Sequence, residues 1–334
     1  MAAQNPNPAP MNGPPMLHIP PRQFVMNLEQ SDTHSDSFVD PSFFKVVIMQ
    51  CTASVHHGTA SVVLERRGMP WFLLPDCFVA SAIAASSDCP IQQLILKQHS
   101  LSDLPLSFSL SATMLPTSLS TLDLSHNCFV SVPTVVCDLV NLQELYLSNN
   151  GILSVPNAFS SLKRLKALYL QNNYLKELSI GVCGLQSLVY LNVEHNELTT
   201  LPSEVSQLTN LQLLHASSNK MEYLPDSIND LSNLQELYLS QNQLKMLPDK
   251  LDGLSSLSQL QLANNKLDCL PLSFVDLKSL KSFTVSGNNL KFPPLSACRA
   301  GVEHLKAFMR SNYHYFEPEH SDSGEDTPFE DIDD

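Results

Sequence analysis

The chain repeats one pattern of apolar residues every 23 positions, and this period constrains its fold more than any other feature. The heptapeptide LQELYLS occurs at residues 142–148 and again, four periods later, at residues 234–240. Leucine opens eight successive copies, at Leu119, Leu142, Leu165, Leu188, Leu211, Leu234, Leu257 and Leu280. Asparagine stands eight positions later in each copy, at Asn127, Asn150, Asn173, Asn196, Asn219, Asn242, Asn265 and Asn288. Such a period predicts a solenoid of stacked copies of one short unit.

Each copy contains an alternating LxLxx segment, which predicts a short strand with its leucines on one face. One such strand cannot bury that face alone, whereas stacked copies can pair in a parallel sheet. The asparagine falls where the chain leaves the strand, so a buried amide there can hydrogen-bond the backbone of neighbouring turns. The Leu-Pro dipeptide that follows in most copies lies on the returning side, where proline's missing N–H costs little. A ninth, degenerate copy starts at Ile91, with His99 in the asparagine position.

The pattern LxxLxLxxNxLxxLPxxxxxLxxL resembles the leucine-rich repeat family in its intracellular 23-residue subclass. The resemblance covers residues 91–294 and implies an α/β solenoid, a horseshoe of about nine repeats with a concave parallel β-sheet. Residues 295–316 resemble the family's C-terminal ending, in which a double proline precedes a capping helix. Helical spacing would place Val302, Leu305 and Met309 against the last repeat. The main departure from the pattern is Leu178-Ser179, which replaces a Leu-Pro dipeptide.

The segments outside the repeats have distinct compositions. Residues 1–37 are rich in proline and asparagine and are predicted to form a disordered arm. Residues 38–90 contain apolar stretches and the only tryptophan, Trp71. We interpret them as an N-terminal cap over the first repeat, with an imperfectly ordered extension as the alternative. Residues 317–334 hold nine Asp and Glu and no Lys or Arg, so they are predicted to be a disordered acidic tail.

Charge and cysteine usage bear on partners and compartment. The net charge is −14, and because much of it lies in the tail, nothing suggests nucleic-acid binding. The N-terminus lacks the basic and apolar regions of a signal peptide. The apolar stretch after Trp71 is interrupted by Pro75 and Asp76 and is too short to cross a bilayer. The eight cysteines show no paired spacing. We therefore expect a monomer with reduced thiols, in the cytoplasm or nucleus and without membrane contact.

The outward positions of the predicted strands are the candidate binding site. Adjacent strands lie about 4.8 Å apart, so aromatic residues of neighbouring repeats should cluster on the concave face. Rigid aromatic side chains on such a surface suit a protein-binding hot spot. The alternative is that tyrosine simply favours strands. The candidate residues are Tyr146, Tyr169, Tyr190, His215 and Tyr238, flanked by Glu144 and Glu236.

No motif supports catalysis. The chain has no phosphate-binding loop, dinucleotide fingerprint, nucleophile elbow or HExxH zinc motif. His56 and His57 have no cysteine or carboxylate at metal-ligand spacing, so we expect no metal and no cofactor. The sequence predicts a non-enzymatic signalling scaffold or adaptor that binds a protein on its concave face. The family also includes substrate-recognition or regulatory subunits of ubiquitin ligases and phosphatases, which is the alternative function.

The acidic tail contains one short motif. Residues 322–327, DSGEDT, resemble the DSGxxS/T phosphodegron, and Ser323 and Thr327 each have an acidic residue three positions later. Phosphates at these hydroxyls would suit capture by an arginine cluster. Six-residue motifs recur by chance in acidic tails, so a purely solubilising tail is the alternative.

Overall fold

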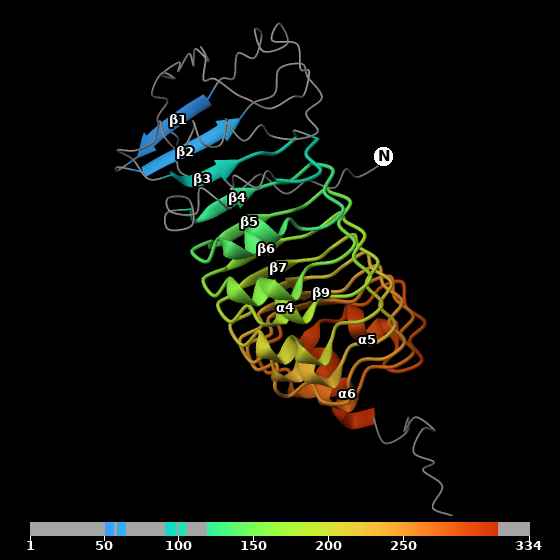
Figure 1. The fold of residues 1–334 in the computed structure, drawn as a ribbon. Coiled ribbons are helices and arrows are strands. Elements are labelled where there is room, and N and C mark those ends of the chain that lie inside the picture. The colour runs from blue at the N-terminus through green and yellow to red at the C-terminus, as the bar shows by residue number, and fades with distance from the viewer. Residues whose placement is uncertain (1–50, 57–58, 65–90, 99, 105–118, 313–334) are drawn as a thin grey trace, which may run out of the picture.

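The computed structural model describes residues 51–56, 59–64, 91–98, 100–104 and 119–312. They form one eleven-stranded sheet in which the strands follow the order of the sequence (Figure 1). The strands are β1 Cys51–His56, β2 Thr59–Leu64, β3 Ile91–Ile95, β4 Thr121–Asp123, β5 Glu144–Tyr146, β6 Ala167–Tyr169, β7 Tyr190–Asn192, β8 Leu213–His215, β9 Glu236–Tyr238, β10 Gln259–Gln261 and β11 Ser282–Thr284. From β4 on, neighbouring strands pair in parallel one period apart, as Leu145 does with Leu168. The predicted solenoid with a parallel sheet is confirmed.

The first two strands extend the sheet before the first repeat. β1 and β2 pair antiparallel, and β2 pairs in parallel with β3. The rest of the predicted cap, including Trp71, lies outside the described residues. So do the predicted arm at residues 1–37 and the acidic tail at residues 317–334, and these assignments stay predictions.

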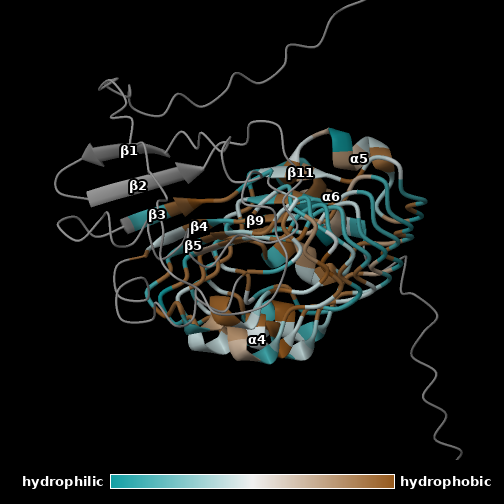
Figure 2. Ribbon diagram, turned by 45° about the horizontal axis from the view of Figure 1, so that its top comes forward, coloured by the Kyte–Doolittle hydropathy of each residue, from teal (hydrophilic) through white to brown (hydrophobic). Residues whose placement is uncertain are grey.

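The leucine columns form a continuous core along the solenoid. Leu122, Leu145, Leu168, Leu191 and Leu214 occupy equivalent positions in successive repeats, and each is fully buried. Figure 2 shows hydrophobic residues alternating with hydrophilic ones along the successive turns. Burying one leucine side chain contributes about 1.5–3 kcal/mol, so the stacking of repeats supplies most of the stability.

Short helices fill the returning side of the repeats. Among the described residues, five are 3₁₀ helices, each preceded by a proline whose missing N–H would have no helical partner at that position. They are η2 Thr134–Asp138, η3 Asn157–Ser161, η4 Ser203–Gln207, η5 Asp226–Asp230 and η6 Leu272–Asp276. Where Leu178-Ser179 replaces Leu-Pro, the chain forms the α-helix α4, Ile180–Cys183, instead. The Ser179 hydroxyl caps it by accepting a hydrogen bond from the Gly181 N–H at 3.1 Å.

Two helices follow the last strand, α5 Leu295–Arg299 and α6 Val302–Asn312. The segment predicted as one capping helix is divided at Gly301, which has a φ of 100°. Leu305 and Met309 of α6 are fully buried, at the positions that helical spacing predicts. Lys306 is also buried, and its ammonium donates to the Leu277 carbonyl at 2.6 Å. A charged hydrogen bond therefore ties α6 to the repeat that opens at Leu257.

Candidate functional site

A ladder of buried asparagines holds the end of each strand. Asn196 is typical, because its side-chain amide donates to the carbonyl of Val193 in its own repeat (3.0 Å) and to that of Leu170 in the preceding one (2.9 Å). Its side-chain oxygen accepts the Leu175 N–H at 3.0 Å. The equivalent contacts recur from Asn127 to Asn288, and all eight asparagines are at most 9% exposed. The sequence-based interpretation of this column is confirmed, and we call it the asparagine ladder.

The residue before each ladder asparagine turns the backbone away from the strand. Seven of these residues are not glycine, yet they adopt left-handed φ values between 51° and 58°. They are His126, Asn149, Asn172, His195, Ser218, Gln241 and Asn264. Sequence reasoning missed this column. The sequence feature that could have predicted these left-handed turns is the polar composition of the column, since Asn and His are enriched among residues that tolerate this conformation.

Five aromatic side chains form a second ladder, on the outward face of strands β5 to β9. Ring centroids of successive members lie 4.3 Å, 4.8 Å, 5.4 Å and 4.3 Å apart. The first and last pairs are stacked, and the middle two are tilted. We call this set the aromatic ladder: Tyr146, Tyr169, Tyr190, His215 and Tyr238. All five side chains are half-buried, so each keeps part of its surface open to solvent.

The aromatic ladder changes column at β7. In the register of the sheet, Asn192 is the residue beside Tyr169 and His215, but it is buried at 7% exposure. Tyr190, two residues earlier, supplies the ring instead, and its hydroxyl accepts a hydrogen bond from the Asn192 amide at 3.3 Å. The sequence placed Tyr190 on the correct face but did not show that it bridges its neighbours.

Carboxylates flank the aromatic ladder at both ends. The Tyr146 hydroxyl donates to Glu144 at 3.1 Å, and the Tyr238 hydroxyl donates to Glu236 at 2.5 Å. Burial and the adjacent glutamates raise the pKa of Tyr146 and raise that of Tyr238 to about 12. Both phenols are therefore protonated donors at neutral pH.

The histidine within the aromatic ladder is neutral at neutral pH. Burial lowers the pKa of His215, while the charges of Glu194 and Glu236 act in the opposite direction. The central part of the ladder is thus uncharged, and its acidic groups lie around it.

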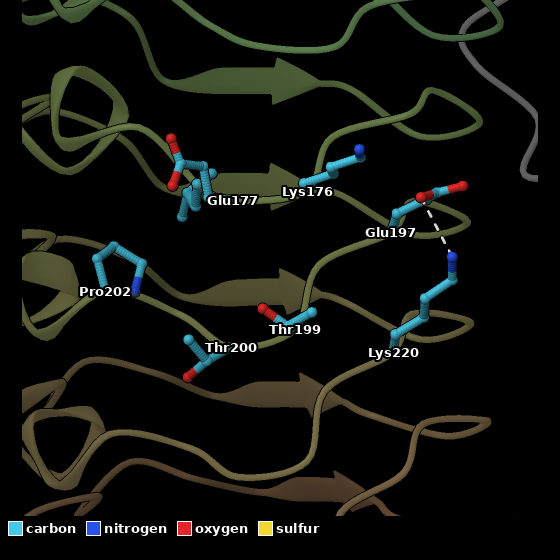
Figure 3. A pocket seen from close by; sticks show the side chains of 8 residues that line it. Lys176, Glu177, Glu197, Thr199, Thr200, Pro202 and Lys220 are labelled. Carbon is cyan, nitrogen blue, oxygen red and sulfur yellow. Dashed lines mark ion pairs between the residues drawn. The ribbon is translucent and has the colours of Figure 1, made fainter.

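One cavity lies away from the aromatic ladder, on the loops that follow the strands (Figure 3). Its volume is about 440 Å³, and its lining includes Lys176, Glu177, Thr199 and Thr200. An ion pair of 3.1 Å between Glu197 and Lys220 runs along one side of it. Charges of both signs line it, no nucleophile and base are paired there, and no member of the aromatic ladder contributes to it.

The described residues offer no metal site, and two of their cysteines are buried. None of their histidine, cysteine, aspartate and glutamate side chains form a group that could hold a metal ion. No helix in the described segments is long and apolar enough to cross a membrane. Cys137 and Cys183 are free and buried on η2 and α4, and burial raises the pKa of both thiols. Raised thiol pKa values disfavour the nucleophilic thiolate.

Models of leucine-rich repeat families match three parts of the chain. A leucine-rich repeat region matches residues 160–243, and leucine-rich repeats match residues 222–267 and 141–162. A search of curated proteins found no match. The matches and the architecture together show that the chain has the leucine-rich repeat fold.

Solved structures with the same fold come from several sources. A leucine-rich repeat protein of Leptospira interrogans is 28% identical with a TM-score of 0.57, over 69% of this chain and 61% of that one. The ectodomain of the Arabidopsis thaliana receptor kinase GASSHO1, in complex with CASPARIAN STRIP INTEGRITY FACTOR 2, is 32% identical with a TM-score of 0.51. The match covers 60% of this chain and 24% of that one. TLR13, in complex with ssRNA13, is 32% identical with a TM-score of 0.53, over 58% and 29%. The match thus spans less than two thirds of each of these chains.

Proposed function

We propose that this protein is a non-catalytic scaffold or adaptor that binds another protein on its concave sheet, at the aromatic ladder. The observation that carries the proposal is the unbroken series of five half-buried rings on five consecutive strands. The solenoid does not need these rings, because the strands on either side of β5–β9 carry Asp123 and Gln261 at the equivalent position.

The aromatic ladder is organised before any partner arrives. Each ring contacts its neighbours, and Tyr146 and Tyr238 are also held by hydrogen bonds to glutamates. Tyrosine has two side-chain torsions, so fixing it on a rigid sheet costs little further entropy on binding. Tyrosines of this kind are enriched among the residues that dominate protein interfaces.

The similar structures support a macromolecular partner. The GASSHO1 ectodomain was solved with CASPARIAN STRIP INTEGRITY FACTOR 2, and TLR13 with ssRNA13. A nucleic acid is the less suitable partner for this chain, since carboxylates flank the aromatic ladder and would repel phosphates.

Four further assignments accompany this proposal. We assign the chain to the intracellular 23-residue subclass on the period of its sequence. We also propose a cytoplasmic or nuclear location and a monomeric state. Phosphorylation of Ser323 and Thr327 stays a prediction, since both residues lie outside the described segments.

Affinity capture from cells, followed by binding measurements with the purified partner, tests the proposed surface. The informative variant is Tyr146→Ala/Tyr169→Ala/Tyr238→Ala. The matched control is Tyr174→Ala/Tyr223→Ala, which removes rings that are 55% and 56% exposed outside the aromatic ladder.

Each lost hot-spot ring costs about 1–3 kcal/mol of binding free energy, so the ladder variant should bind at least about a hundredfold more weakly. The control should bind like the wild type. Equal binding by the ladder variant, with its fold intact by circular dichroism, would reject the concave face as the docking surface.

A further inference from the structure

From β4 to β11 the concave face carries charge of one sign only, whereas the preceding repeat, which contains β3, has Lys97 at an outward position. Three outward columns run along strands β4 to β11, at the second, fourth and sixth positions after the first leucine of each repeat. They contain four carboxylates, Asp123, Glu144, Glu194 and Glu236, and no lysine or arginine. The basic residues closest in sequence, Lys166 and Lys281, stand one position before the strands β6 and β11.

The loop surface of the same repeats is different. There Glu197 pairs with Lys220 at 3.1 Å, and Glu222 pairs with Lys245 at 2.6 Å. On the concave face, by contrast, neither Glu144 nor Glu236 forms an ion pair with a lysine or arginine of the described segments. The acidic groups beside the aromatic ladder thus retain their attraction for an external cation.

The ends of the aromatic ladder offer the ring faces that a cation prefers. Within the ladder, each inner face meets a neighbouring ring. Beyond Tyr146 the next strand carries Asp123, and beyond Tyr238 it carries Gln261, so no ring of these neighbouring strands covers the two outer faces. The face of an aromatic ring attracts cations through its quadrupole.

The repeated heptapeptide places the same pair of groups at both ends. Its Glu and Tyr are Glu144 and Tyr146 in the first copy and Glu236 and Tyr238 in the second. Four strand spacings separate the copies, which corresponds to about 19 Å between the glutamates. A cation stacked on each outer ring face would lie about one ring thickness further out, so two such cations would be roughly 26 Å apart.

We propose that the concave face binds an extended protein segment with two cationic side chains, best arginines, six to eight residues apart. At about 3.3 Å per residue, that spacing covers the distance between the two ends of the aromatic ladder. A guanidinium can pair with a carboxylate and stack on a tyrosine at once, which suits the Glu and Tyr at each end. This inference rests on the proposed function and adds the chemistry of the partner.

Probes can be selected from a phage library of random peptides, so the natural partner need not be known. Each peptide is about twelve residues long and can span the aromatic ladder when extended. The bait is the full-length wild-type chain. Enriched peptides are synthesised with a fluorescent label and titrated by fluorescence polarisation at low and physiological salt. The test variant is Glu144→Gln/Glu236→Gln, and the matched control, Glu197→Gln/Glu222→Gln, removes the same charge from the loops. The Tyr146→Ala/Tyr169→Ala/Tyr238→Ala variant completes the set.

The inference expects enriched peptides with two Arg or Lys six to eight residues apart. They should bind the Glu144→Gln/Glu236→Gln variant about tenfold more weakly than the wild type, and salt should weaken wild-type binding. The loop control should bind like the wild type.

Three results would overturn the inference. The first is enrichment of peptides without such a cationic pair, and the second is an equal affinity for the Glu144→Gln/Glu236→Gln variant. If the triple tyrosine variant still fails to bind the peptides in either case, the concave face remains the docking surface and only the charge assignment fails.

The third result is a lack of enriched peptides together with binding of a labelled single-stranded RNA that the triple variant does not bind. It would make the partner a nucleic acid. Peptides that bind the triple variant as tightly as the wild type would contradict the proposed function itself.

Discussion

The asparagine ladder and the aromatic ladder run along the same sheet but differ in what they bind. The asparagines occur in all eight regular repeats, are nearly inaccessible to solvent and hydrogen-bond the backbone of adjacent turns. The aromatic rings occur on five strands, are half-buried and contact mainly one another. A solenoid needs the first ladder in every turn, whereas strands without an outward aromatic residue pair just as regularly. The second ladder is therefore the one that can be assigned to function.

The difference also separates two kinds of energetic cost. Removing a ladder asparagine such as Asn196 leaves one buried N–H without a partner, which costs about 1–3 kcal/mol. It also takes one of two amide donors from the Leu170 and Val193 carbonyls. Removing a ring exposes neighbouring rings on a surface that is already partly solvated, which costs less. Stability should therefore depend mainly on the asparagines and binding mainly on the rings.

The largest effect is expected in the asparagine ladder. Asn196→Ala removes hydrogen bonds to Leu170, Val193 and Glu194 and orphans the Leu175 N–H, so we expect a loss of about 3–5 kcal/mol in the free energy of unfolding. Urea unfolding followed by circular dichroism measures it.

Asn192→Ala is the matched control, since Asn192 is buried in the same repeat but bonds only the Tyr190 hydroxyl and the Glu194 N–H. Its loss should be about 1 kcal/mol. Similar losses of unfolding free energy in the two variants would show that the asparagine ladder stabilises the fold no more than another buried asparagine does.

A smaller effect is expected from stacking within the aromatic ladder. Tyr146 and Tyr169 are stacked with their centroids 4.3 Å apart and their planes 6° apart. A double-mutant cycle with alanine at both positions should give a coupling energy of about 0.5–1.5 kcal/mol in the unfolding free energy. The same cycle on Tyr146 and Tyr238, at opposite ends of the aromatic ladder, should give a coupling near zero. Coupling of equal size in both cycles would argue against ring-to-ring contact as its cause.

The smallest effect concerns pH. His215 has a pKa below its usual 6.5 in the folded protein, mainly because of burial. As the pH falls, His215 is therefore protonated in the unfolded chain before it is protonated in the folded protein. The stability that neutral His215 contributes is present above pH 6.5 and is lost as the pH falls through the folded pKa. Glu194, Glu236, Tyr190 and Tyr238 face His215 and are unchanged in His215→Gln. Between about pH 7.5 and about pH 5.5, wild type should lose more unfolding free energy than His215→Gln. Parallel curves for the two proteins would contradict this assignment.

The sequence predicts those parts of the molecule that every repeat must share. Leu145 and Asn150 recur because each turn buries the same strand face and satisfies the same backbone groups. The outward direction of Tyr146 and Tyr169 follows from the same period. Contacts that occur in a single repeat cannot be predicted in this way, because the shared period carries no information about them.

Three details illustrate this limit. Tyr190 bridges two columns because the outward position between Tyr169 and His215 holds Asn192, which has no ring. Ser179 caps an α-helix at the position where proline precedes a 3₁₀ helix in five other repeats. Gly181 allows the close approach, since a Cβ there would lie 2.6 Å from the Asn157 Cα. Gly301 divides the final helical segment through its positive φ. Each depends on a side chain or backbone angle of a single repeat, which periodicity does not report.

The most direct test of the central claim is hydroxyl-radical footprinting, read by mass spectrometry, of the wild-type protein with and without the partner it captures from cells. The account predicts that Tyr146, Tyr169, Tyr190 and Tyr238 lose reactivity in the complex, while Tyr174 and Tyr223 keep theirs. No substitution is involved, so the result does not depend on the stability of a variant. Protection of Tyr174 and Tyr223, with unchanged reactivity along the aromatic ladder, would contradict the assignment of the concave face as the binding surface.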